Sequence, residues 1–193
     1  MTKVYFVRHA QPEHTWEDDR TRPLTEDGKR DSGIVLEFLK DKKIDVFYCG
    51  PYKRSMDTIA KAADFFGKEI ITDERLRERE KGINGNYHGM YQKRWKNHSY
   101  HEDGGESIQM VQNRNISALQ EILSNNQEKN IVIKIHGTAL SSILNYYNSD
   151  FGCENFLRII DWMPYIIELD FEENTFLGLQ EHCYIEKEFQ GKK

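Results

Sequence analysis

The segment Lys3-Val4-Tyr5-Phe6-Val7-Arg8, followed by His9-Ala10, decides the fold. Its β-branched and aromatic side chains form a short apolar run almost at the start of the chain, which is typical of a buried β-strand. The run ends at Arg8-His9, where two basic side chains follow one another. We therefore expect a core strand that places an arginine and a histidine at its carboxyl end.

Strands and helices alternate beyond this segment. Short apolar runs predict further strands at residues 45–49, 69–72 and 130–135. Apolar residues at helical spacing, with start signals at Thr25 and Pro51, predict helices. These helices cover residues 25–42, a segment after Pro51 that includes Ile59, residues 107–123, and a segment after Gly137.

Near the end of the chain, residues 165–170 and 175–180 flank a polar turn at 171–174 and predict a hairpin. Strands that alternate with helices in the preceding part imply right-handed crossovers and parallel pairing. The sequence therefore predicts an α/β protein. We expect a three-layer αβα sandwich with a mostly parallel central sheet and a C-terminal antiparallel hairpin.

Length and composition limit the classes of protein to consider. The chain has 193 residues, of which 38% are hydrophobic, and this predicts one domain spanning 1–193. Its net charge of −5 gives no global positive field for nucleic acid or an anionic membrane. The three cysteines form no CxxC pair, which argues against a disulfide framework or a zinc knuckle. Without a signal-peptide pattern or a long apolar stretch, a cytoplasmic location is expected.

The stretch between Gly82 and Gly105 differs in composition from the predicted elements around it. It is polar and aromatic, with no clear period, and so predicts a lid-like insertion at about 82–105. Its aromatic residues are expected to form a packed cluster or a wall of the substrate site. His98 and His101 stand three residues apart beside acidic residues, but we expect no metal site there.

Charged side chains follow several of the predicted strands directly. Arg8-His9 ends the first strand, Arg54 follows the second, Glu78 comes after the third, and His136-Gly137 ends the fourth. Ligands of parallel sheets bind at the carboxyl ends of the strands. Arginine forks and helix N-termini suit a phosphate group, so a local phosphate site is predicted in an otherwise acidic protein.

These residue types also suit phosphoryl transfer. A neutral imidazole can attack phosphorus and form a phosphohistidine, which requires no metal or other cofactor. The leaving alkoxide needs a proton, and a carboxylic acid beside an anionic substrate tends to have a raised pKa suited to supplying it. Glu78 is the candidate for this role, although Glu74 and Glu80 lie in the same charged run.

The ordered set of motifs resembles the histidine phosphatase superfamily, also called the phosphoglycerate mutase-like proteins. The resemblance covers residues 3–145. The motifs that carry it are Phe6-Val7-Arg8-His9-Ala10, Gly50-Pro51-Tyr52-Lys53-Arg54, Leu76-Arg77-Glu78, Gly104 to Ser107, and His136-Gly137. Two positions depart from the family pattern, since Gly50 and Ile135 stand where a serine is usual.

The resemblance implies His9 as the nucleophile and Glu78 as the proton donor. It also implies that Arg8, Arg54 and His136 bind the phosphate, and Gly137, at the N-terminus of the helix that follows, is expected to bind it with them. Two residues shortly after the nucleophile, Gln11 and His14, are expected to touch substrate. For Arg22, a structural salt bridge and a ligand role are equally expected.

The function predicted is a metal-independent phosphomonoesterase that hydrolyses small phosphorylated metabolites through a phosphohistidine. One alternative is a cofactor-dependent phosphoglycerate mutase, but the Arg-His-Gly-Glu-Ser start that is characteristic of family mutases is absent here. A second alternative is a non-catalytic module that binds phosphorylated ligands. The expected partner is a small-molecule phosphate ester, with no nucleic acid and no membrane, and the oligomeric state stays open.

Overall fold

The computed structural model describes residues 1–188, which contain one six-stranded mixed sheet. Its order is β3-β2-β4-β1-β5-β6. The first four strands in this order pair in parallel, whereas β5 runs antiparallel to β1 and β6 antiparallel to β5. The strands are β1 (Thr2–Arg8), β2 (Val46–Cys49), β3 (Ile70–Thr72), β4 (Asn130–Ile135), β5 (Trp162–Glu172) and β6 (Thr175–Glu186). The predicted fold class, including the C-terminal antiparallel hairpin, is confirmed.

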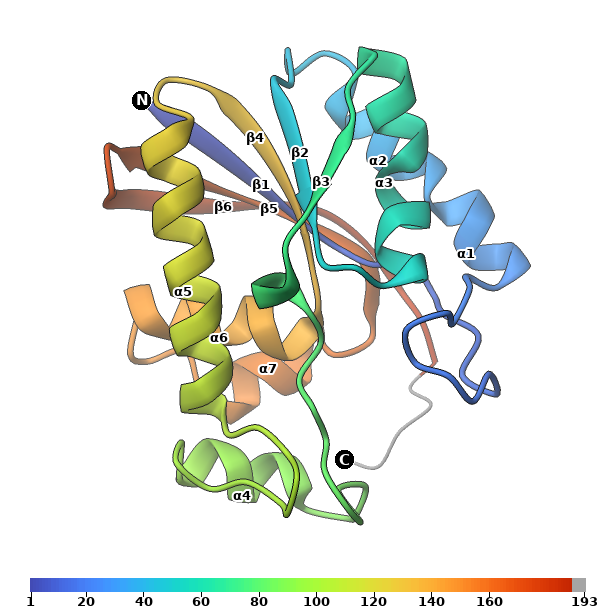
Figure 1. Ribbon diagram of the computed structural model, residues 1–193, viewed down its shortest axis with the longest axis vertical. Coiled ribbons are helices and arrows are strands. Elements are labelled where there is room, and N and C mark those ends of the chain that lie inside the picture. Colours follow the sequence, from blue (N-terminus) through green and yellow to red (C-terminus); the bar gives the residue numbers. More distant parts are fainter. Residues whose placement is uncertain (189–193) are drawn as a thin grey trace.

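Helices cover both faces of this sheet, as Figure 1 shows. One face carries α1 (Glu26–Asp31), α2 (Gly33–Leu39) and α3 (Lys53–Phe66). The opposite face carries α5 (Ile108–Asn125), α6 (Gly137–Tyr147) and α7 (Cys153–Ile159). A single-turn helix, η1 (Glu74–Leu76), and α4 (Met90–Lys96) lie in the connection between β3 and α5.

The side chains of β4 show how the sheet divides the core. Ile131, Ile133 and Ile135 belong to the apolar cluster under α5 and α6. Val132 points to the other face and joins the cluster under α2 and α3. Lys134 shares the face of Val132, because side chains alternate along a strand. It is 0% exposed, so a lysine occupies a core position in the middle of the sheet.

Two predicted elements differ in extent from the observed ones. The helix predicted at 25–42 is broken into α1 and α2 at Ser32, whose hydroxyl donates to the carbonyl of Lys29. Such bonds from serine to the preceding turn bend helices. The hairpin is longer than predicted on both strands, and its turn is confined to Glu173-Asn174, since β5 is buried along most of its length.

Helix α7 was not predicted from the sequence. It is only seven residues long and begins after Gly152, whose N–H donates to the Asn155 side chain. Phe156 and the following Ile160 pack against residues of the 82–105 segment. A short helix of this kind is stabilised by its packing rather than by its own propensity.

The segment 82–105 is a compact unit at the carboxyl edge of the sheet (Figure 1). An isolated bridge between Lys81 and Gly105 joins its two ends. Inside it, Arg94 and Glu102 form a buried ion pair at 2.8 Å. Trp95 of α4 packs on Phe156, with ring centroids 5.8 Å apart. The aromatic residues therefore form a packed cluster against α7, and the segment holds a defined shape.

No helix within residues 1–188 is both long enough and apolar enough to cross a membrane.

Gly50, directly after β2, lies against the backbone that leads from η1 to Glu78. A Cβ at this position would lie 2.6 Å from the carbonyl oxygen of Leu76. Gly50→Ala should therefore lower the free energy of unfolding by about 1–3 kcal/mol, the usual cost of overpacking. Urea unfolding measures this.

Gly33→Ala is the matched control for Gly50→Ala. Gly33 lies in α2 with nothing within 4 Å of the added carbon. Because alanine favours a helix over glycine by about 0.5–1 kcal/mol, this variant should be as stable as the wild type or more so. Equal stability of Gly50→Ala and the wild type would contradict the close approach of these two chain segments.

Candidate active site

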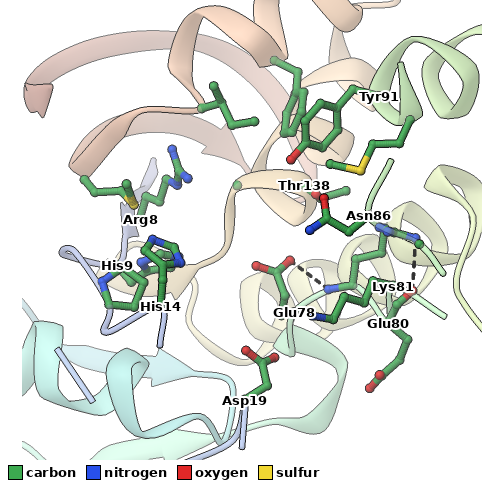
Figure 2. A pocket seen from close by; sticks show the side chains of 18 of the residues that line it. Arg8, His9, His14, Asp19, Glu78, Glu80, Lys81, Asn86, Tyr91 and Thr138 are labelled. Carbon is green, nitrogen blue, oxygen red and sulfur yellow. Dashed lines mark hydrogen bonds between the residues drawn. The ribbon is translucent and has the colours of Figure 1, made fainter. Parts of the chain in front are cut away.

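The carboxyl ends of the parallel strands open into a cavity of about 480 Å³. β1 contributes Arg8 and the adjoining His9, α3 contributes Arg54, and α6 contributes Gly137. Glu78 lies across from Arg8 and His9, as Figure 2 shows. The sequence predicted basic and acidic residues after several different strands, and five of these positions line one cavity: Arg8, His9, Arg54, Glu78 and Gly137.

His9 has a fixed orientation in this cavity. Its Nδ1 lies 2.9 Å from the carbonyl oxygen of Ala10, and a carbonyl can only accept, so Nδ1 carries a proton and donates. Burial, and then the positive charges of Lys134 and Arg54, lower the pKa of His9 well below its ordinary value. The ring is therefore neutral at pH 7. Its Nε2 keeps a free lone pair, as a nucleophile requires.

Backbone carbonyl groups bind the side chain of Arg8. Its Nη1 donates to the carbonyl oxygens of Ile159 and Trp162, whereas its buried Nε has no hydrogen-bond partner. Gly137 lies directly against the guanidinium, because a Cβ there would be 3.3 Å from Nε. The arrangement leaves Arg8 beside the N-terminus of α6, where the backbone also favours an anion.

Arg54 is 2% exposed and already has an anionic neighbour. Its Nη1 donates to the carbonyl oxygen of Asp19 and lies 3.2 Å from one Asp19 carboxylate oxygen. The guanidinium also lies over the ring of Tyr52, 4.7 Å from its centroid. The Asp19 carboxylate is at the lower edge of the cavity in Figure 2. Arg54 thus presents a carboxylate-binding fork that a phosphate oxygen could also use.

His136 and Glu78 face each other, with Nδ1 and Oε2 3.3 Å apart. Burial and then Lys134 lower the pKa of His136 to about 3. Burial alone would raise the pKa of Glu78, but the nearby His136 ring and the Arg54 charge outweigh burial and hold that pKa below its usual range. Both lowered pKa values fit a neutral His136 whose Nδ1–H donates to an ionised Glu78.

The structure separates Glu78 from its two competitors. Glu74 is exposed and forms a bidentate pair with Arg20. Glu80 also lines the cavity, but its side chain is 54% exposed and lies 3.8 Å from Arg77. Of these three carboxylates, Glu78 is the one that contacts His136.

The Gly104–Ser107 motif supports the segment that carries Glu78. Glu106 accepts hydrogen bonds from the side chains of Arg77 and Arg114 and from the backbone N–H of Glu80. Arg114 also donates to the carbonyl oxygen of Glu78 itself. The motif therefore fixes the backbone on both sides of the candidate proton donor.

Three residues near the nucleophile have different places in the structure. His14 and Arg22 line the cavity. Gln11 does not, since its side-chain oxygen accepts a hydrogen bond from the Thr25 hydroxyl at the start of α1. Arg22 donates to Asp19 at 2.7 Å, so it has a salt bridge and also a position at the cavity. We leave Gln11 out of the proposed site.

Several residues at or near the cavity escaped the sequence analysis. Asp19 lies in a polar loop without periodicity, and nothing in that loop marked it. Asn86 and Met90 of the 82–105 segment also line the cavity and had no signal, whereas Tyr91, which lines it too, is one of the aromatic residues expected to form a packed cluster or a wall of the substrate site. Lys134 had a signal, because it is the one charged residue in the apolar run NIVIKI. A lysine inside a central strand predicts a polar partner in the core.

The same residues also form a set that could hold a metal ion. One ligand atom each from His9, Glu78 and His136 all lie within 4.8 Å of one another. Two imidazoles and a carboxylate are a common donor set for zinc and other transition metals. Chelation therefore has to be part of any test of activity.

The protein is an αβα protein whose cavity, at the carboxyl ends of the parallel strands, is lined by arginine and histidine side chains. Ligands of such α/β proteins bind at this edge of the sheet. The sequence profile of the histidine phosphatase superfamily (branch 1) matches residues 4–177. The chain belongs to this superfamily.

Individual relatives agree with this assignment. A putative phosphoserine phosphatase 2 of Hydrogenobacter thermophilus is 28% identical over 95% of this chain and 98% of its own. A probable phosphoglycerate mutase of Enterobacter sp. is 28% identical over 75% of this chain and 74% of its own. A phosphoserine phosphatase of Entamoeba histolytica, solved with 3-phosphoglyceric acid, has the same fold with a TM-score of 0.76 and 20% identity, covering 97% and 98% of the two chains.

Arg54→Ala should weaken the binding of inorganic phosphate. Losing a charge-assisted hydrogen bond costs about 1.5–3 kcal/mol, which corresponds to a roughly 10- to 150-fold higher Kd. Isothermal titration calorimetry measures it. Arg20→Ala is the control, since Arg20 lies over the same Tyr52 ring but pairs with Glu74 at the surface. Unchanged phosphate affinity in Arg54→Ala would exclude this arginine from the anion site.

Proposed function

We propose that this protein is a phosphomonoesterase that hydrolyses small phosphorylated metabolites through a phosphohistidine on His9. The observation that carries the proposal is the state of His9, which is a buried, neutral imidazole with its Nδ1 proton held by Ala10 and its Nε2 free. Two arginines, Arg8 and Arg54, line the same cavity, and Glu78 lies opposite. A binding module would need the arginines but not an oriented nucleophile facing a carboxyl group.

In the first step of the proposed mechanism, Nε2 of His9 forms a bond to phosphorus. The bond between phosphorus and the ester oxygen breaks, and the leaving alkoxide takes a proton from the carboxylic acid of Glu78. Arg8, Arg54 and the N-terminus of α6 at Gly137 hold the phosphoryl oxygens, together with the N–H of His136. This electrostatic support matters most as charge shifts in the transition state.

In the second step, water hydrolyses the phosphohistidine. The Glu78 carboxylate now takes a proton from water, the oxygen of that water bonds to phosphorus, and the bond between phosphorus and Nε2 breaks. His9 returns to its neutral form. Glu78 thus acts as an acid and then as a base, and no other proton carrier is required.

The protonation of Glu78 depends on the ligand. Without an anion in the cavity its pKa is held low, because His136 and Arg54 favour the carboxylate. A phosphate dianion beside the carboxylate opposes that ionised form and also engages the same positive groups. We propose that substrate binding raises the pKa of Glu78 and so prepares the acid for the first step.

The substrate class follows from the mixed charge of the outer cavity. Arg22 and Lys81 line it together with Asp19 and Glu80. Groups of both signs suit a small phosphate ester that also carries a carboxylate, with or without an amine. Phosphoserine and 3-phosphoglycerate, which appear in the names of the relatives above, are the first compounds to test. We place the selection of the alcohol in the loop 11–21 and the insertion at 82–105.

Other interactions are proposed on the basis of charge. A net charge of −5, with several basic side chains lining one cavity, favours a small anionic ligand over nucleic acid or a membrane surface. We propose a cytoplasmic enzyme of one domain.

Phosphate release is the first test of this function. The protein should liberate phosphate from phosphoserine or 3-phosphoglycerate without added bisphosphoglycerate, and EDTA should not stop it. His9→Ala should abolish turnover, whereas the exposed His88→Ala should not. Protein quenched under conditions that preserve phosphohistidine should carry its phosphate on His9.

The mutase alternative predicts a different result in the same assay. Efficient interconversion of 2- and 3-phosphoglycerate, with little phosphate released, would make this protein a mutase. Loss of activity in EDTA that added zinc restores would instead point to metal chemistry at His9, Glu78 and His136.

Glu78→Gln tests the proton donor. General acid–base catalysis is typically worth about 10²–10⁴-fold, so kcat on an alkyl phosphate such as phosphoserine should fall within that range. The burst of phosphohistidine formation from p-nitrophenyl phosphate should slow much less, because its phenolate leaves without a proton. Glu74→Gln is the matched control and should change neither, since Glu74 is exposed and pairs with Arg20 away from the cavity lining. Equal slowing of both substrates in Glu78→Gln would show that Glu78 only positions the phosphate.

A further inference from the structure

Lys134 is a charged residue in the centre of the sheet. It is 0% exposed, and its neighbours across the strands are Val7 of β1 and Cys49 of β2. The mechanism above does not use it. Burying an amine costs several kcal/mol unless its hydrogen bonds are made, so its partners are informative.

The amine of Lys134 has two partners, and both lie beneath the cavity. Nζ donates to Oγ of Ser55 at 2.6 Å. It also lies 3.2 Å from Nε2 and 3.3 Å from Nδ1 of His136. Ser55 Oγ is in turn 3.3 Å from Nε2 of the same ring. Lysine, serine and histidine therefore form a closed buried triangle.

Nζ lies almost equally close to both nitrogens of the His136 ring, so the tautomer is indicated by the other partners of the ring, Ser55 at Nε2 and Glu78 at Nδ1. The amine of Lys134 donates to Oγ of Ser55. Because that oxygen accepts from the lysine, its own O–H is free to donate to Nε2 of His136. With Nε2 acting as an acceptor, the ring proton of a neutral His136 must be on Nδ1. That nitrogen faces Oε2 of Glu78 at 3.3 Å, where a donor is needed.

We propose that Lys134 is a positioning residue of the phosphatase reaction, which acts through Ser55 to hold His136 in the tautomer that carries its proton on Nδ1 and donates into the cavity. The opposite tautomer would present a lone pair to Glu78 and to the phosphoryl oxygens. The chain from Lys134 through Ser55 and His136 to Glu78 thus links a core lysine to the reacting group. This inference rests on the function proposed above.

The charges around the amine are consistent with this role. The titratable groups that interact electrostatically with it are Arg8 and His9 at the end of β1, Cys49 of β2, Arg54 of α3, His136 after β4, and Glu78. Burial lowers the pKa of Lys134 well below its ordinary value. Among nearby charged groups Lys134 has the largest effect in lowering the pKa of both His9 and His136. The lysine therefore also favours neutral imidazoles, which both proposed roles require.

A purely structural lysine would be a poor choice for this position. Val132, two residues earlier on the same face, is an ordinary core residue, and an unbranched apolar side chain of similar length would fill the space of Lys134 without a buried amine. Lys134→Met makes that replacement and should fold. Ser55→Ala removes the hydroxyl group that lies between Lys134 and His136 and keeps the lysine.

The tautomer of His136 is the first readout. Nitrogen NMR of histidine-labelled protein distinguishes a ring protonated on Nδ1 from one protonated on Nε2. The wild type should show the Nδ1 form for His136, and both variants should shift toward the Nε2 form. Val132→Ala, the control, should lose stability but keep the Nδ1 form. This readout does not depend on turnover, so an inactive wild type would refute the proposed function while still testing the inference.

Turnover is the second readout. In Lys134→Met and Ser55→Ala, kcat/KM on the best alkyl phosphate should fall about 10- to 100-fold, the loss typical when the outer partner of a functional histidine is removed. Val132→Ala should stay within about twofold of the wild type, since it removes no partner of the ring. A retained Nδ1 tautomer in both variants, or a changed tautomer with unchanged kcat/KM, would overturn the proposal.

Discussion

Three basic side chains, Arg8, Arg54 and Lys134, are buried within or directly beneath one cavity of a protein whose net charge is −5. Burying them is costly, and the surrounding structure supplies a partner to each. Carbonyls of Ile159 and Trp162 bind Arg8, Asp19 binds Arg54, and Ser55 binds Lys134. The buried basic side chains thus bind three separate segments: the loop after α7, the loop before α1 and the start of α3.

Burial and neighbouring charges together set the protonation states of the site. Burial, and then the charge of Lys134, lower the pKa of His9 and His136, so both rings are neutral. Burial alone would raise the pKa of Glu78, but His136 and Arg54 outweigh it and favour the carboxylate. A neutral nucleophile is the form that can attack phosphorus. Burial and the neighbouring charges therefore keep His9 in the form that its proposed role as nucleophile requires.

The sequence predicted the parts of this site that follow from strand ends and not those that depend on packing. Arg8-His9 and His136-Gly137 come directly after apolar runs, and the rule that parallel strands end at one edge was enough to bring them together. Gln11 shows the limit of that reasoning, because nearness in sequence to His9 did not predict that its side chain turns to Thr25. Lys134 and Ser55 are 79 positions apart, and only their side-chain packing shows that they are partners.

Asp19 shows why the buried arginine is stable without a ligand. Its carbonyl and carboxylate oxygens lie at the Arg54 guanidinium, and Arg22 binds the same carboxylate. In the proposed site, a phosphate would compete with Asp19 for Arg54, so ligand binding would exchange one anion for another. Arg22 binds the same Asp19 carboxylate and also lines the cavity, so Asp19 bridges two arginines of the site. We infer that the loop 11–22, which carries both Asp19 and Arg22, links the proposed anion site at Arg54 to the part of the cavity that faces the rest of the ester.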